Sequence, residues 1–195
     1  MESLPGKLSS LPTQGPPLAK FATLAMRAAE LLRTPQALFN LSPTDATCVV
    51  AHMRLMHFER GVTLMREGDQ TQGDYLLLLL DGDVSVETTA GGAPDAVAIA
   101  VIGPGSVIGE MALLDGAPRS VSCIALSPVQ AAGLSREGLE QLIALHPLVA
   151  AKLLVELATR IADRLRALGE QLHMYAKLTA DLQAEVERLR APVRR

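Results

Sequence analysis

Apolar residues recur with a helical spacing near the start of the chain. From Leu18 to Leu32 they fall every three or four positions, which predicts an amphipathic helix that stops at Thr34-Pro35. Ser42 and Pro43 have the chemistry of a helix cap and a first turn, so a second helix is predicted from there to about Met56. We expect the first helix to pack on its own domain or on a dimer mate; docking to another protein is the alternative.

The spacing then becomes that of short strands. Apolar runs follow, separated by Gly-Asp, Asp-Gly and Gly-Gly turns, at residues 61–65, 75–80, 84–88, 97–102, 121–126 and 129–134. Short strands at such intervals predict a sandwich or jelly roll. The run 76–80 is apolar at every position, so it is predicted to be buried on both faces in the middle of the roll.

From Ser135 onward the pattern is helical again. Ser135 is the predicted cap of a helix that ends near Leu145, and a long helix is predicted from about Leu148 until Pro192 stops it. Positions of this long helix at alternating spacings of three and four form one apolar stripe, with Thr179 as its single polar member. The stripe consists of Ala158, Ile161, Leu165, Leu168, Leu172, Tyr175, Thr179, Leu182, Val186 and Leu189. It predicts a coiled-coil seam, and hence a homodimer through residues 158–189.

These patterns divide the chain into three predicted parts. Residues 1–33 are a flexible extension plus an amphipathic helix, because Pro, Gly, Ser and Thr dominate the first 17 positions. Residues 34–147 form the β-rich domain, and residues 148–191 form the C-terminal dimerisation helix. The expected fold class is α+β, with N-terminal helices, an eight-stranded β-roll and a long C-terminal helix.

Composition excludes several classes of protein. The 195 residues are 49% hydrophobic with a formal net charge of −3, which offers no general attraction to nucleic acid or to an anionic membrane. Cys48 and Cys123 lack ligand spacing, as do the four histidines, so we expect no metal and a reducing, cytoplasmic location. No apolar run is long enough to span a membrane. No catalytic constellation of Ser, Cys, His and Asp is evident, and no cofactor is expected.

The segment from Gly103 to Ser122 carries the candidate chemistry. An apolar run reaches a turn at 103–105, and Gly109 then opens a helical segment that can extend only to Leu114 before Asp115-Gly116 stops it. The first backbone N–H groups of a helix have no partner within it and carry the positive end of its dipole. Residues 109–112 are therefore predicted to cradle an anion.

Two side chains refine the expected ligand. Arg119 follows the predicted cradle closely, and a guanidinium beside exposed N–H groups matches a phosphate. Glu110 would repel a bare phosphate but could accept a hydrogen bond from a neighbouring hydroxyl, such as a ribose 2′-OH. A dinucleotide fingerprint is the competing interpretation of the glycines, but it requires a long crossover helix that Pro118 prevents. A glycine-rich turn with a surface arginine is the plain structural alternative.

Gly109-Glu110-Met111-Ala112-Leu113-Leu114, followed after four residues by Arg119-Ser120, resembles the phosphate-binding cassette of cyclic nucleotide-binding domains. Bacterial catabolite activator proteins and regulatory subunits of cyclic-AMP-dependent protein kinase carry this cassette. The resemblance spans roughly residues 38 to 165 and includes Leu38-Phe39-x-Leu41-Ser42 and Glu67-Gly68-Asp69.

The resemblance implies a role for each site residue. Gly109, Glu110, Met111 and Ala112 with Arg119 would hold the cyclic phosphate, and Glu110 would hold the ribose. Ser120 could donate to the phosphate or accept from a syn guanine. The base would meet Asp163 and Arg164, although catabolite activator proteins present a Thr-Ser pair to adenine there. The Arg-Ser form of the cassette favours cyclic AMP over cyclic GMP.

The implied function is a cyclic nucleotide receptor. Binding would reposition the long helix and pass the signal to a protein partner. Related transcription factors place a helix-turn-helix domain of on the order of sixty residues after this helix. The chain stops at Arg195, so we expect no DNA binding by this protein alone. A dimerising adaptor without regulation is the alternative, and a cyclic phosphodiesterase is the third hypothesis.

Overall fold

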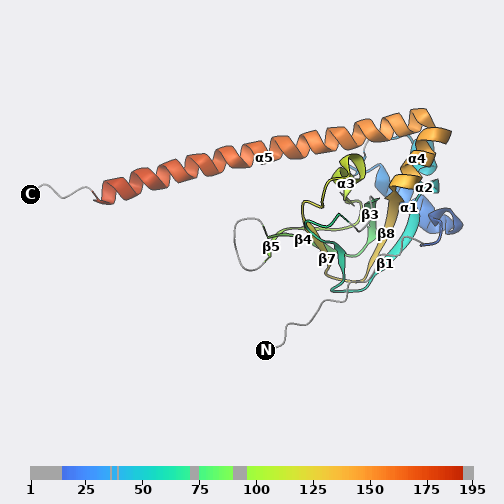
Figure 1. Cartoon of the computed structure of the whole chain (residues 1–195), viewed down its shortest axis with the longest axis horizontal. Coiled ribbons are helices and arrows are strands. Elements are labelled where there is room, and N and C mark those ends of the chain that lie inside the picture. The colour runs from blue at the N-terminus through green and yellow to red at the C-terminus, as the bar shows by residue number, and fades with distance from the viewer. Residues whose placement is uncertain (1–14, 36, 39, 71–74, 90–95, 191–195) are drawn as a thin grey trace, which may run out of the picture. The chain divides into compact units, whose positions relative to one another are not determined.

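The computed structural model describes residues 15–190, except residues 36, 39, 71–74 and 90–95. The chain divides into two compact units, one ending at Leu157 and the other beginning at Ala158, and Figure 1 follows the chain through both. The first unit contains every strand of the described residues, and the second consists of the remainder of the long helix and the C-terminal residues. Each unit is described separately.

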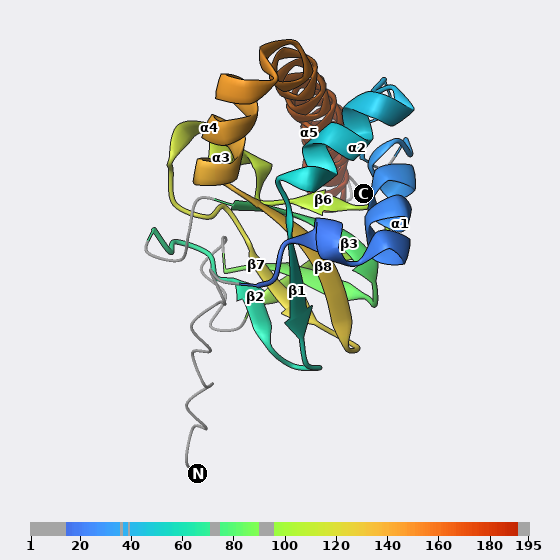
Figure 2. The ribbon, with the colours of Figure 1, turned by 90° about the vertical axis from the view of Figure 1, so that its right-hand side faces the viewer.

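The N-terminal helices belong to the first unit. A 3-10 turn at Leu18–Lys20 leads into α1 (Ala22–Leu32), and α2 (Pro43–Ala51) follows after a loop. The two helices contact each other, and α1 lies beside the strand formed by Tyr75–Asp81 (Figure 2). Ala28 and Leu32 are fully buried, so the first helix packs on its own domain.

The predicted extension of the second helix to Met56 is wrong. α2 ends at Ala51, and residues 54–58 form the strand β1. An apolar pair such as Leu55-Met56 fits either a helix or a strand, and pairing with β8 decides in favour of the strand. The flexible lead expected through residue 17 also ends earlier, because the carbonyl oxygen of Pro16 accepts the Leu55 N–H at 3.0 Å.

In the part of the chain that the structure describes, the strands form two antiparallel sheets of four, which is the expected roll. The strands are β1 (Arg54–Phe58), β2 (Thr63–Met65), β3 (Tyr75–Asp81), β4 (Val84–Thr88), β5 (Val97–Ile102), β6 (Val107–Ile108), β7 (Ser122–Ala125) and β8 (Val129–Ser135). One sheet has the order β1-β8-β3-β6 and the other β2-β7-β4-β5. The strands β1 and β6 were not among the predicted runs, since β6 has only two residues and β1 was assigned to a helix.

The strand β3 supplies both hydrophobic cores, as its uninterrupted apolar run predicted. Leu76, Leu78 and Leu80 enter a cluster shared with the helices, while Leu77 and Leu79 enter a second cluster with residues of both sheets. All five side chains are at most 2% exposed. Because successive strand residues point to opposite faces, only a strand covered on both sides can bury such a run.

Two helices follow the roll. The Oγ of Ser135 accepts the Gly138 N–H at 3.1 Å and caps α4 (Arg136–Leu145), as expected. The helix α5 (Pro147–Arg190) begins two residues after α4 ends, slightly earlier than predicted; the expected stop at Pro192 lies outside the described residues. None of the described helices combines the length and hydrophobicity that a bilayer crossing requires.

Candidate functional site

The helix α3 (Glu110–Asp115) begins at a glycine that no other residue could replace without strain. Gly109 caps it with a φ of 80°, in the left-handed region. A Cβ on Gly109 would lie 2.5 Å from the Nη1 of Arg119, 2.5 Å from the Cε of Met65 and 2.8 Å from the carbonyl oxygen of Tyr75. The absence of a side chain therefore allows Arg119 to reach the N-terminal end of α3.

Arg119 reaches the cap of α3 through its guanidinium group. Its Nη1 donates to the carbonyl oxygen of Gly109 at 3.0 Å, and its Nη2 donates to that of Tyr75 at 3.0 Å. The guanidinium carbon lies 4.8 Å from the centre of the Tyr75 ring, within the range of a cation–π contact. Arg119 is only 6% exposed, so the structure holds its positive charge in a defined position beside the cap.

Tyr75 contacts Arg119 within the candidate site, a position that the sequence did not identify. Its hydroxyl donates to the carbonyl oxygen of Leu64 at 2.9 Å, which fixes the ring beneath Arg119. Burial raises the pKa of Tyr75 well above its ordinary value, and the positive charge of Arg119 opposes part of that rise. A tyrosine at the start of an apolar strand gives no sequence signal of this role.

The backbone of Arg119 is held by the turn between β2 and β3. Gly68 donates its N–H to the Arg119 carbonyl oxygen at 2.8 Å, and Arg119 donates its own N–H to the carbonyl oxygen of Asp69 at 3.2 Å. Glu67, the first residue of this turn, accepts the Thr89 N–H at 2.8 Å. That backbone bond is the main cause that lowers the pKa of Glu67. The turn thus joins the cassette to the end of β4.

The other predicted cassette residues lie around α3 with different exposures. Glu110 is 1% exposed and Ala112 is buried, whereas Met111 and Ser120 are exposed. Glu110 is in the first turn of α3, where the helix dipole favours a carboxylate. The structure therefore brings Gly109, Glu110, Ala112 and Arg119 together and leaves the side chains of Met111 and Ser120 at the surface.

The C-terminal end of α3 is tied to α4. The carbonyl oxygen of Ala112 accepts the Gly116 N–H at 2.9 Å and the Nη2 of Arg136 at 3.2 Å. Arg136 is the first residue of α4, which α5 follows closely. One hydrogen bond therefore connects the cassette helix to Arg136, and the main chain continues from there through α4 to α5.

The two residues expected to meet the base belong to the second unit. Asp163 and Arg164 are exposed on α5, and Asp163 forms an ion pair with Arg166, one turn later. The structure therefore gathers six of the eight predicted site residues in the first unit. Within residues 15–190, apart from the gaps, no three His, Cys, Asp or Glu side chains are grouped to hold a metal.

Comparison with known proteins identifies relatives of this chain. Residues 55–146 match the family model described as the cyclic nucleotide-binding domain. The cyclic AMP receptor protein of Thermus thermophilus is 32% identical over 123 residues, which cover 63% of this chain and 56% of that protein. The CRP-like cAMP-activated global transcriptional regulator of Mycobacterium tuberculosis is 26% identical over 132 residues, covering 68% and 58% respectively. The chain spans little more than half the length of these relatives.

A solved structure extends the match. The crystal structure of a cyclic nucleotide-binding domain from Methylobacillus flagellatus superposes with a TM-score of 0.65 at 34% identity, covering 74% of this chain and 80% of that one. The match therefore includes most of that domain. On this likeness and on the cassette geometry, the chain belongs to the cyclic nucleotide-binding domain family.

Proposed function

We propose that this protein is a receptor for a cyclic nucleotide, with cyclic AMP preferred over cyclic GMP. One observation carries the proposal most directly: the buried Arg119 places its Nη1 3.0 Å from the carbonyl oxygen of Gly109, at the cap of α3. Arg119 is the only basic residue between Gly103 and Ser122. A phosphate binds well where a positive charge lies next to the first N–H groups of a helix.

In the proposed complex, the cyclic phosphate binds the backbone of residues 109–112 and the guanidinium of Arg119. The Glu110 carboxylate accepts from the ribose hydroxyl, and Ser120 lies beside the phosphate. The base meets Asp163 and Arg164 of α5. The names of the two bacterial relatives, which specify cyclic AMP, support the preference for that nucleotide.

The output of the proposed receptor is a movement of α5 that a protein partner reads. We propose that residues 34–147 form the sensor and residues 148–191 the dimerisation helix. Homodimer formation through residues 158–189 would join two sensor domains through one shared coiled coil. The formal net charge of −3 favours a protein partner over DNA.

The test of the phosphate anchor is calorimetric titration of Arg119→Leu with cyclic AMP. Loss of a buried charge-assisted partner should weaken binding about 30-fold to 1000-fold. Arg27→Leu, on the exposed part of α1, is the matched control and should bind as the wild type does. Affinity of Arg119→Leu within about threefold of the wild type would remove Arg119 from the site.

The same titration separates the proposed receptor from its alternatives. A wild-type protein that binds neither cyclic AMP nor cyclic GMP would be a dimerising adaptor rather than a receptor. Incubation of the protein with cyclic AMP, followed by chromatography of the nucleotide, tests the phosphodiesterase hypothesis. We expect the cyclic nucleotide to be recovered unchanged.

A further inference from the structure

The first turns of α5 are fastened to the start of α2 by two polar contacts. The Nζ of Lys152 lies 2.7 Å from the Oδ2 of Asp45. The Nδ2 of Asn40 donates to the Oε1 of Glu156 at 2.9 Å. The backbone nitrogen of Asn40 lies 3.4 Å from the Oε2 of Glu156. We call these four residues the latch. Lys152 and Glu156 are one helical turn apart, so one face of α5 meets both Asp45 in the first turn of α2 and Asn40 just before that helix.

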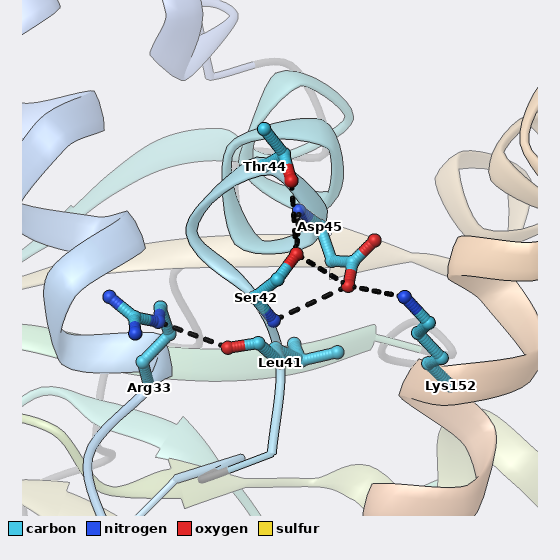
Figure 3. A network of polar contacts seen from close by, with 6 residues as sticks. All are labelled: Arg33, Leu41, Ser42, Thr44, Asp45 and Lys152. Carbon is cyan, nitrogen blue, oxygen red and sulfur yellow. Dashed lines mark hydrogen bonds and ion pairs between the residues drawn. The ribbon is translucent and has the colours of Figure 1, made fainter.

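The α2 side of the latch is held by a network of hydrogen bonds (Figure 3). Ser42 and Asp45 form a reciprocal capping box, in which the Ser42 Oγ accepts the Asp45 N–H at 3.1 Å and the Asp45 Oδ2 accepts the Ser42 N–H at 3.3 Å. On the other side of the loop, the Nε of Arg33 donates to the carbonyl oxygen of Leu41 at 3.0 Å. The Asp45 side chain is only 11% exposed, so its partner Lys152 meets a carboxylate that cannot readily turn away.

Apolar packing alone does not fix the position of α5 along its own axis. Ala150, Leu153 and Leu157 are at most 2% exposed and attach the same turns to the core. Such contacts are nondirectional, whereas a short ion pair and an amide–carboxylate bond exist only in one register. The latch therefore selects one position of α5 among those that the core would accept.

We propose that the latch opposes the movement of α5 and so lowers the affinity for the nucleotide. This inference depends on the proposed receptor function. Asp163 lies seven positions after Glu156, about 10 Å along the continuous helix α5. A displacement that brings Asp163 and Arg164 to the base is thus transmitted to Glu156 and breaks its contact. Contacts that exist only before the movement subtract from the binding free energy.

The test uses the full chain with Lys152→Met, Glu156→Met and the double variant. Methionine keeps a long side chain at each position but can neither pair with Asp45 nor accept from the Nδ2 of Asn40, and both changes leave the α2 capping box intact, which a change at Asp45 would not. Glu170→Met and Lys177→Met, exposed elsewhere on α5, are the matched controls. Thermal unfolding by circular dichroism verifies that every variant is folded.

Calorimetry with cyclic AMP should give about three- to tenfold tighter binding for the double variant, with both controls unchanged. The expected gain in affinity is modest because each latch contact is partly exposed to solvent. Unchanged or weaker binding by the double variant would overturn the proposal.

A second measurement needs no nucleotide. Amide hydrogen exchange of residues 147–157 should be faster in the double variant than in the wild type and the controls, because release of the latch favours local opening. Unchanged exchange would mean that the contacts do not hold α5, and the latch would be rejected. If the wild type bound neither cyclic AMP nor cyclic GMP, the receptor function would fail. The exchange result would then still decide whether the latch holds the helix.

Discussion

At the scale of single residues, the cassette depends on a glycine that makes room for a charge. Gly109 has a left-handed φ and meets three atoms within 3 Å of where a Cβ would stand. Arg119 uses that space to bond with the cap, and Tyr75 supplies both a carbonyl acceptor and a ring surface. The sequence indicated Gly109 and Arg119 by their types and spacing. The sequence could not indicate Tyr75, because folding alone brings its carbonyl oxygen and its ring next to Arg119, which lies 44 positions later in the chain.

Gly109→Ala should weaken cyclic AMP binding at least about tenfold, because the new Cβ displaces Arg119 from the cap. The free energy of unfolding should fall by about 2–4 kcal/mol, from the left-handed φ and the crowding together. Gly61→Ala is the matched control, since Gly61 has a φ of 81° and no atom within 4 Å of the Cβ position. It should lose only about 1–2 kcal/mol and keep its affinity. Equal effects of the two changes would contradict the close-approach argument.

At the scale of elements, the end of α2 could not be predicted, because long-range strand pairing decides the structure of the residues that follow it. The α2 start was predictable, because Ser42, Pro43 and Asp45 carry local capping chemistry. Its end was not, because residues 54–58 pair with β8, more than seventy positions later in the chain. Asp45 also pairs with Lys152 of α5, a contact that no local pattern predicts.

The cap of α2 should make stability depend on pH. Hydrogen bonds from Lys152 and then Ser42 lower the pKa of Asp45 below its ordinary value of 3.8. A carboxylate with a depressed folded-state pKa stabilises the fold at pH values above its unfolded pKa, and loses that contribution as the pH falls through the folded-state pKa. The melting temperature of the wild type should therefore exceed that of Asp45→Asn at about pH 6, and the difference should shrink below about pH 4.

Thermal unfolding monitored by circular dichroism between pH 6 and pH 2.5 measures this difference, with Asp181→Asn, exposed on α5, as the control for loss of one surface carboxylate. A difference that stayed constant across this range would show that the Asp45 charge contributes nothing.

At the scale of the whole molecule, the second unit exposes the predicted seam in the single chain. Leu165, Leu168 and Leu172 are 70%, 55% and 68% exposed, and Leu182 and Val186 are also exposed. A helix with so much apolar surface favours association. The side chain of Leu189, the last seam position, lies outside the described residues.

Leu172→Glu should weaken the proposed dimer about 100-fold or more, because each buried leucine contributes about 1.5–3 kcal/mol and the symmetric dimer loses two. Met174→Glu is the matched control, since Met174 is 60% exposed on the same helix but lies off the seam. Sedimentation or light scattering over a concentration series measures both. Dissociation of the Met174→Glu protein, with Leu172→Glu still dimeric, would place the interface on another face.

By itself, the sequence determined what local chemistry controls: the cap at Ser42, the cap at Ser135, the apolar run of β3 and the short helix that begins after Gly109. Each of these features depends on residues that lie within a few positions of one another in the sequence. Only the tertiary structure decided that residues 54–58 form a strand, that Tyr75 lies beneath Arg119 and that Lys152 reaches Asp45. Each of these joins segments distant in the chain, and such contacts arise from the shape of the packed core rather than from local preference.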